Sequence, residues 1–155
     1  MGFDIYGVKP NNPKGIPQPA YLDWSTKPSK KETDRHYKAL AYYEDNVKGS
    51  YFRATVWYWR PLWSYVSTSC TFLSQKDIEG GWSNSGYKIS KTKAIKIGKL
   101  IEEHSISDVL YVYKKIYDDI GIENTINPEK GYHFDVGLIE RFGVFCKNSG
   151  GFEIS

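Results

Sequence analysis

The segment from Tyr51 to Tyr65 constrains the fold of this chain more than any other stretch. It contains seven aromatic residues and two arginines in fifteen positions. Tryptophan has the largest flat apolar face of any side chain, and an arginine can stack on such a face or bind an anion with its planar guanidinium group. A segment of this composition therefore forms either a heavy hydrophobic core or a recognition surface.

Apolar residues in this segment recur at steps of four, three, four and three, which is the spacing of an amphipathic helix. They are Phe52, Val56, Trp59, Trp63 and Val66. Pro61 opposes a straight helix, because a proline inside a helix removes one hydrogen bond and clashes with the carbonyl group four residues earlier, at a cost of about 3 kcal/mol. Residues 51–59 also have high strand propensity but show no clean alternation. We therefore predict a helix with a kink or break at Pro61.

Short patterns elsewhere predict the remaining elements. Helical spacing of apolar residues together with capping residues predicts helices at residues 33–48, after Ser90, after Ser107 and at about 134–148. Alternating segments at residues 3–7 and 152–154 predict two short terminal strands that pair with each other. The predicted fold class is mainly α, with four to five helices around an aromatic-rich core and two short terminal strands, for which an α+β description is the alternative.

A proline-rich segment predicts a long loop near the start of the chain. Five of the seven prolines lie between Pro10 and Pro28, so residues 8–32 cannot form a long helix. Tyr21, Leu22 and Trp24 are apolar enough to dock this loop on the body, and we favour an ordered loop over a floppy one. Shorter loops are predicted by composition at residues 80–86 and 122–133.

The length of 155 residues predicts a single domain, spanning residues 1–155, with a substantial core. The net charge of +3 is unevenly distributed, because residues 51–100 carry eight Lys/Arg against two Asp/Glu and residues 101–155 carry five against ten. An anionic partner would meet the middle third, although the basic and acidic parts could equally neutralise each other. The small net charge argues against a general nucleic-acid binder.

The two cysteines, Cys70 and Cys146, form no CxxC pair, and the three histidines match no metal-ligand spacing. Two cysteines could form one disulfide, but the chain begins without the basic and apolar segments of a signal peptide. No stretch reaches the roughly 18 apolar residues of a membrane span. These features predict a cytoplasmic protein with two buried thiols and with no metal, cofactor or membrane partner.

Arginines and aromatic rings of the central segment are the main binding candidates. A nucleotide offers a base that stacks on an aromatic side chain, worth about 1–3 kcal/mol, and phosphates that arginine binds through charged hydrogen bonds. The candidate ligand-binding residues are Arg53, Trp57, Tyr58, Trp59, Arg60, Lys88 and Lys91. In the alternative interpretation the tryptophans form the core and the arginines pair with carboxylates such as Asp4, Asp135 or Glu140.

Four sequence segments together resemble a group of short hypothetical proteins met in bacteriophage and bacterial genomes. These segments are Met1-Gly2-x-Asp4-x-Tyr6-Gly7, Tyr51-Phe52-Arg53-x-x-Val56-Trp57-x-Trp59-Arg60-Pro61-Leu62-Trp63-x-Tyr65, Asn84-x-Gly86 and Ser149-Gly150-Gly151-Phe152-Glu153-Ile154. The resemblance implies a phage or prophage accessory protein in the host cytoplasm, and it transfers no catalytic role.

Three functions are compatible with these observations. The first is a binding module for a small phosphorylated or nucleotide-like molecule, which in a phage setting suits sequestration of a host defence signal. The second is a protein-interaction module that docks on a host or phage protein through exposed aromatic residues, and the third is a small hydrolase that uses His133 and Asp135. They predict, respectively, a concave pocket, a flat exposed patch, and a histidine close to a carboxylate in a cleft. A site shared between subunits of a homo-oligomer is also open.

Overall fold

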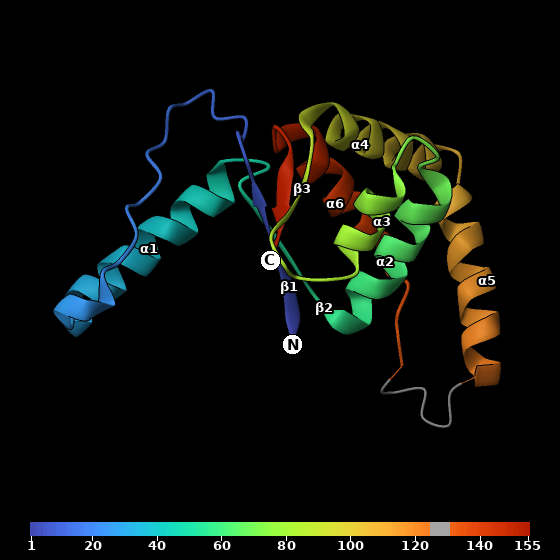
Figure 1. Cartoon of the computed structure of the whole chain (residues 1–155), viewed down its shortest axis with the longest axis horizontal. Coiled ribbons are helices and arrows are strands. Elements are labelled where there is room, and N and C mark those ends of the chain that lie inside the picture. Colours follow the sequence, from blue (N-terminus) through green and yellow to red (C-terminus); the bar gives the residue numbers. More distant parts are fainter. Residues whose placement is uncertain (125–130) are drawn as a thin grey trace.

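The computed structural model describes residues 1–124 and 131–155. Along the chain the elements are β1 (Gly2–Gly7), the 3-10 helix η1 (Trp24–Thr26), α1 (Lys30–Asn46), β2 (Tyr51–Thr55), α2 (Val56–Ser69), α3 (Gln75–Gly81), β3 (Tyr87–Ile89), α4 (Lys91–Ile106), α5 (Val109–Asn124), α6 (Val136–Asn148) and β4 (Phe152–Ile154). The described part thus combines six α-helices with a four-stranded antiparallel sheet (Figure 1). The high helical content agrees with the predicted class, but two further strands join the two predicted ones, so the fold is α+β.

The two ends of the chain meet in the middle of the sheet, whose strand order is β2-β1-β4-β3. In β1, Ile5 lies opposite Phe52 of β2 on one side and opposite Ile154 of β4 on the other. The backbone groups of Asp4 and Ser155 also exchange two hydrogen bonds of 2.8 Å. The predicted pairing of the terminal strands is therefore confirmed.

The central aromatic segment is not one helix, which corrects the prediction for its first part. Residues 51–55 form β2 and pair with β1, and the helix α2 begins only at Val56. Phe52 and Ala54 are buried while Arg53 and Thr55 are exposed, which is the alternation of a half-buried strand. Residues 51–55 form a strand because β1 supplies hydrogen-bond partners for their backbone. The local sequence pattern does not indicate this long-range pairing.

The core is built from stacked aromatic rings, as predicted. Trp59 is fully buried between Phe3 and Trp63, with ring centroids at 5.3 and 5.5 Å, and Phe142 meets it edge to face. The indole nitrogen of Trp59 donates to the carbonyl oxygen of Gly81 at 2.7 Å. Each buried indole N–H thus has a partner, since that of Trp63 donates to Ile78 O at 2.9 Å.

The remaining elements follow the predictions with shifted ends. The expected helices correspond to α1, α4, α5 and α6, and the Ser90 side chain caps α4 as predicted. The helix α3 and the strand β3 were not predicted, and the first two residues of the predicted loop 80–86 complete α3. The predicted loop 122–133 is wrong at its start, because α5 continues to Asn124, while residues 125–130 lie outside the described residues.

Residues 8–46, which we call the arm, project from the connection between β1 and β2. The arm consists of an irregular segment and the helix α1, and both extend to one side of the sheet (Figure 1). Between Ile5 and Tyr43 no residue is buried. The expectation that Tyr21 and Trp24 dock the loop on the body is wrong, because these side chains are 88% and 52% exposed.

Candidate functional site

The junction of β2 and α2 brings three of the predicted ligand residues to the surface. Arg53 faces outward because side chains alternate along β2, and Trp57 and Tyr58 lie in the first turn of α2, both partly exposed. Thr55, the N-cap residue of α2, makes no side-chain capping hydrogen bond to this helix. Of the seven predicted residues, Arg53 and Tyr58 therefore line a common hollow, described next, and Trp57 is exposed beside Tyr58 in the chain.

A hollow of about 250 Å³ lies beside this junction, and we call it the arginine hollow. Residues from β2, α2 and α6 and the cap of α6 line it: Arg53, Ala54, Thr55, Tyr58, Asp135, Leu138 and Arg141. Two guanidinium groups and one phenol thus border one concave surface. Paired guanidinium groups suit a phosphate or carboxylate, because each can donate two parallel hydrogen bonds to such an anion.

Acidic side chains next to the hollow are already engaged. Arg53 Nε lies 3.5 Å from Asp4 Oδ1, and the Tyr51 hydroxyl also donates to Asp4. Burial, and then the hydrogen bond to Asp4, raises the pKa of Tyr51 well above its usual range. Asp135 accepts a hydrogen bond of 2.8 Å from the backbone of Leu138 and so caps α6. Since an exposed ion pair contributes only about 0–1 kcal/mol, an anion could compete with Asp4 for Arg53.

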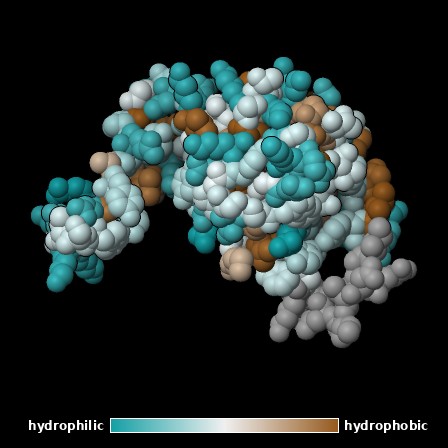
Figure 2. All heavy atoms as spheres, viewed as in Figure 1, coloured by the Kyte–Doolittle hydropathy of each residue, from teal (hydrophilic) through white to brown (hydrophobic). Residues whose placement is uncertain are grey.

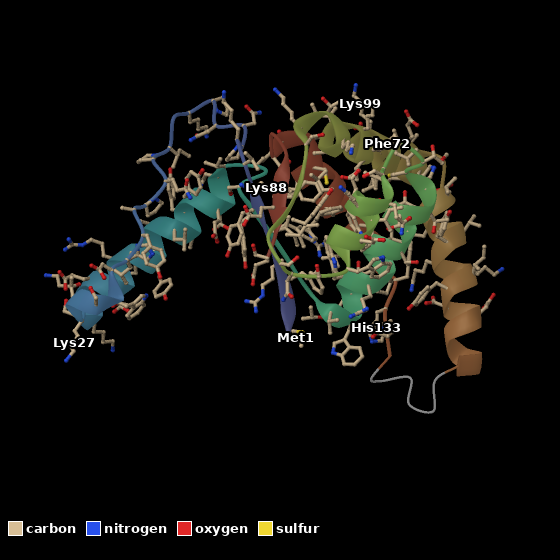
Figure 3. The ribbon with its side chains drawn as sticks, in the orientation of Figure 1. Met1, Lys27, Phe72, Lys88, Lys99 and His133 are labelled. Carbon is tan, nitrogen blue, oxygen red and sulfur yellow. The ribbon has the colours of Figure 1, made fainter. Side chains whose placement is uncertain are left out.

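Two aromatic pairs involve the first turn of α2. The ring centroids of Trp57 and Tyr132 are 5.2 Å apart, and those of Tyr58 and His133 are 5.3 Å apart. Pro61 has no N–H group to donate to the Trp57 carbonyl oxygen four residues earlier, and the backbone N–H of His133 donates to that oxygen instead, at 2.9 Å. Because of the proline, the Trp57 carbonyl oxygen is available to accept the hydrogen bond from His133. In Figure 3, His133 lies toward the same end of the molecule as Met1.

The other predicted ligand residues lie elsewhere, so the seven residues do not form one site. Trp59 is in the core and offers no face to a ligand, which corrects its assignment. The guanidinium carbon of Arg60 lies over the ring of Trp82, 6.0 Å from its centroid. Lys88 of β3 pairs with Glu153 at 3.4 Å, and Lys91 begins α4. Because β2 and β3 are the two edges of the sheet, Lys88 is separated from Arg53 by two strands.

The arrangement of His133 and Asp135 does not resemble a catalytic pair. The imidazole of His133 packs against Tyr58, and the carboxylate of Asp135 caps α6. Among the hydrogen bonds of the described residues, none joins these two side chains. The described residues also contain no group of three or more His, Cys, Asp or Glu side chains that could hold a metal ion.

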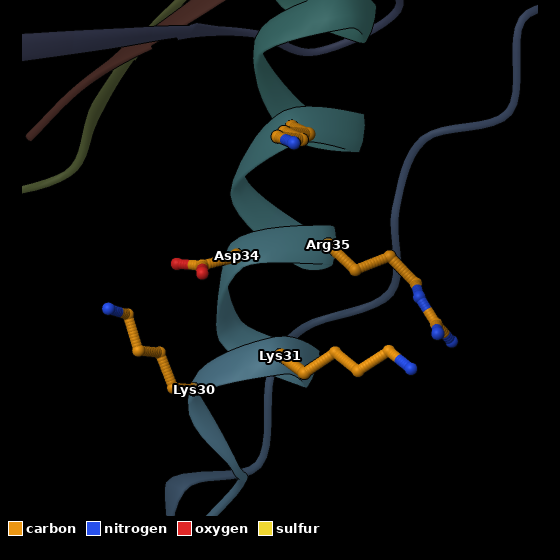
Figure 4. A pocket seen from close by; sticks show the side chains of 5 residues that line it. Lys30, Lys31, Asp34 and Arg35 are labelled. Carbon is orange, nitrogen blue, oxygen red and sulfur yellow. The ribbon is translucent and has the colours of Figure 1, made fainter.

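The arm presents a second accessible surface. Its exposed aromatic residues are Tyr21, Trp24, Tyr37 and Tyr42. The first turns of α1 form a shallow, open surface that is lined by Lys30, Lys31, Asp34, Arg35 and Lys38. Lys31 and Arg35 extend to one side of the helix, and Lys30 and Asp34 to the other (Figure 4). Figure 2 shows the arm as a mostly hydrophilic projection beside the body.

Two features of these sites were not predicted. Arg141 lies on an exposed position of α6, and no local pattern connects it with Arg53 of β2. The prolines of residues 10–28 predicted the irregular part of the arm, because prolines interrupt regular structure. Nothing in the sequence predicted that the arm projects from the body.

No known family model matches this chain, and no curated protein or solved structure is significantly similar to it. Within the described residues, no helix has the length and apolar character required to cross a bilayer.

Proposed function

We propose that this protein is an interaction module that binds another macromolecule through its arm. The observation that carries this proposal is the length of the connection between β1 and β2. These strands are antiparallel neighbours, and about two to five residues suffice to join such a pair, yet here residues 8–50 do so. Connections carry binding residues more often than the elements they join, and a connection of this length that contains a helix far exceeds what the strand pair requires.

The monomer gives the arm little stabilisation. Most helix stability in proteins comes from the packing of an apolar face, and α1 packs little of its surface on the body. Ser29 and Glu32 form a capping box at its start, which contributes locally, but of its residues only Tyr43 is buried. Exposed tyrosine and tryptophan side chains are typical of binding surfaces. A partner that covers Tyr37 and Tyr42 would supply the packing that the body does not.

In the phage or prophage setting that the sequence resemblance implies, the partner is a host or phage protein in the host cytoplasm. Net charge supports a protein partner over a general nucleic-acid partner, because +3 over 155 residues is a weak electrostatic drive.

The test is site-specific photo-crosslinking in an expressing bacterial cell. A photoreactive phenylalanine analogue replaces Tyr37 or Tyr42 in the arm, and in the matched control it replaces Lys99, an exposed residue of α4 that lies away from the arm (Figure 3). We expect discrete adducts from the two arm positions and none from position 99. Adduct patterns that are identical at all three positions, or no adduct from the arm, would refute the proposal.

A second candidate function is the capture of a small phosphorylated or nucleotide-like molecule in the arginine hollow, for example to sequester a host defence signal. The observation that favours it is the convergence of Arg53 and Arg141 from different elements. A thermal-shift screen with mononucleotides, cyclic di- and trinucleotides and ADP-ribose derivatives tests it, since a ligand at a hundred times its Kd adds about 2.7 kcal/mol of apparent stability.

The variants for this screen follow from the geometry. Arg53→Ala and Arg141→Ala should each abolish the shift, whereas Arg60→Ala should retain it, because Arg60 lies against Trp82 outside the hollow. The absence of any shift in the unmodified protein, or its loss in Arg60→Ala alone, would eliminate this second candidate.

A further inference from the structure

The strand β2 has one open edge. It is an outer strand of the sheet and pairs with β1 on one side only. In an antiparallel pair, residues that exchange backbone hydrogen bonds alternate with residues whose backbone groups point away from the partner strand. Two hydrogen bonds fix the phase of this alternation. Val56 donates its N–H to the Met1 carbonyl oxygen at 3.3 Å, and at the other end Gly7 donates to the Ser50 carbonyl oxygen at 2.9 Å.

The backbone groups of every second residue of β2 therefore point out of the sheet. By the register of the ladder, the backbone groups of Phe52 and Ala54 face β1. The outward N–H groups are those of Tyr51, Arg53 and Thr55. Among the described residues, none of these N–H groups has a hydrogen-bond partner. An unpaired strand edge of this kind is a template on which another extended segment can add.

The arginine hollow lies along this open edge. Arg53 and Thr55 point to one face of the sheet and Ala54 points to the other, yet all three line the hollow, which places it at the edge of the strand. Leu138 and Arg141 of α6 also line it. The hollow is therefore bordered by a strand edge that offers backbone groups and by a helix that offers one apolar and one cationic side chain.

The charges of the hollow favour an acidic segment. Arg141 lies on an exposed position and takes part in none of the ion pairs between described residues. Arg53 pairs with Asp4 at 3.5 Å, but its side chain remains 65% exposed. The Asp135 carboxylate accepts a hydrogen bond from the Leu138 backbone and caps α6. An incoming carboxylate would meet two cations here, and guanidinium groups bind carboxylates through charged hydrogen bonds.

We propose that an extended acidic segment of a partner protein adds to the sheet as a further strand, between the open edge of β2 and α6. Its backbone bonds to the outward groups of Arg53 and Thr55, and its side chains alternate between the face of Arg53 and the wall that contains Arg141. Such strand addition obtains affinity from main-chain hydrogen bonds and specificity from alternate side chains. The inference does not depend on the arm, and it assigns a peptide to the arginine hollow in place of the nucleotide of the second candidate function.

A second copy of this chain is the competing occupant, because two open edges can pair. The copy would offer β2, with the sequence YFRAT, or β3, with the sequence YKI. Neither strand contains an acidic residue. Either pairing would therefore bring a further cation to the two arginines of the hollow and no carboxylate, and like charges on neighbouring strands destabilise the pairing.

The first test uses a defined peptide and the full chain. The probe is a peptide of about eight residues that alternates glutamate and valine, labelled with fluorescein at its start and amidated at its end. Fluorescence anisotropy measures its binding. We expect saturable binding of this probe and none of a control peptide with lysine in place of glutamate. No binding of the glutamate peptide would overturn the inference.

Methylation of the probe's backbone tests the strand pairing itself. N-methylation of one alternate set of residues removes the N–H groups that face β2, whereas methylation of the other set removes only groups that face away. We expect binding to fall about tenfold or more with one set and by less than about twofold with the other. Equal losses with both sets would refute strand addition.

The second test removes one outward donor from the protein. The φ angle of Thr55 is −68°, which proline adopts without strain, and the Thr55 N–H takes no part in the pairing with β1. Thr55→Pro should weaken binding of the glutamate peptide about tenfold. Thr55→Ala is the matched control, because it keeps the N–H and loses no side-chain cap, and it should bind within about twofold of the unmodified protein. If Thr55→Pro strongly lowers the melting temperature, the methylated peptides decide, because they leave the protein unmodified.

A third variant tests the charge. Arg141→Ala should weaken binding of the glutamate peptide about tenfold, whereas Lys99→Ala, on the exposed side of α4, should have no effect. A loss in Arg141→Ala together with full binding by a folded Thr55→Pro would indicate a charge contact without strand addition and would contradict the inference.

These outcomes separate the proposals. Nucleotides that raise the melting temperature of a chain that does not bind the glutamate peptide would support the second candidate function and eliminate this inference. Photo-crosslinks from positions 37 and 42 test the arm alone. Their absence would refute the proposed function and would leave strand addition at β2 standing.

Discussion

Asp77 is the group whose removal has the most quantifiable consequence. Only 3% of this residue is exposed, and it joins three elements. Its carboxylate accepts hydrogen bonds of 2.8 Å from the backbone N–H and the hydroxyl of Ser74, which cap α3, and one of 3.0 Å from the Tyr87 hydroxyl of β3. It also forms an ion pair with Lys93 of α4. Protonation or removal of the Asp77 carboxylate would leave all of these donors without their charged acceptor.

The stability that Asp77 contributes depends on pH in a defined direction. Burial alone would raise its pKa, but the hydrogen bonds from Lys93, Ser74 and Tyr87 outweigh burial and lower it from 3.8 to about 2. That difference corresponds to roughly 2 kcal/mol of free energy of unfolding. Because the folded-state pKa is the lower one, the contribution is complete above roughly pH 5, falls by about half near pH 3, and is lost below pH 2.

Urea denaturation at pH 7 and pH 3 measures this contribution. At pH 7, Asp77→Asn should lower the free energy of unfolding by about 2–4 kcal/mol, because it also leaves Lys93 without its partner. Between pH 7 and pH 3 the variant should lose about 1 kcal/mol less than the unmodified protein. Asp45→Asn, at an exposed position, is the matched control and should behave like the unmodified protein. If Asp77→Asn unfolds within about 0.5 kcal/mol of the unmodified protein and with the same pH dependence, the reasoning is wrong.

Three further predictions concern the core. Trp59→Ala should lower the free energy of unfolding by about 3–5 kcal/mol in urea denaturation, because it removes a fully buried indole, and a loss below about 1 kcal/mol would contradict its place in the core. Gly81→Ala should destabilise by about 1–3 kcal/mol or more in the same assay, since an added Cβ would lie 1.8 Å from the Trp63 ring. Burial raises the pKa of the Cys70 thiol to about 12, so at pH 8 a thiol reagent should label Cys70 and Cys146 only on unfolding, and rapid labelling of the folded protein would refute this.

Local signals predicted those elements whose ends are marked by capping residues. Ser90 begins α4 in the structure as it does in the pattern, because its hydroxyl accepts from the Lys93 backbone, an interaction that spans only three residues. Asp135 caps α6, but no cap was predicted for that helix, and Ser107, which was predicted to begin the helix α5, instead ends α4 and donates its hydroxyl hydrogen to the Glu103 carbonyl oxygen. The terminal strands were predictable because Phe3 and Ile5 alternate with polar residues and become the buried face of β1. The cap of α3 by Ser74 and Asp77 carries the same local signal and could have been found.

The candidate site was predictable only in part. Arg53, Trp57 and Tyr58 reach the surface as expected, but the helical period that would place Arg53 on one face with Trp57 and Arg60 does not apply across a junction between a strand and a helix. A single change of period at Val56 rotates every following side chain relative to Arg53. This change follows from the pairing of β2 with β1, which lies fifty residues away along the chain.

The amino-acid sequence by itself predicted an aromatic-rich core, a helix that begins after Ser90, and two buried thiols. These outcomes depend on apolar periodicity and on hydrogen bonds between residues a few positions apart, and both can be recognised along the chain. Only the tertiary structure decided that Arg53 and Arg141 border one hollow, that Lys88 lies at the opposite edge of the sheet, and that the arm projects without a cover. The physical reason is that such proximity arises from strand order and from the packing of helices against the sheet, which depend on contacts between residues far apart in the chain.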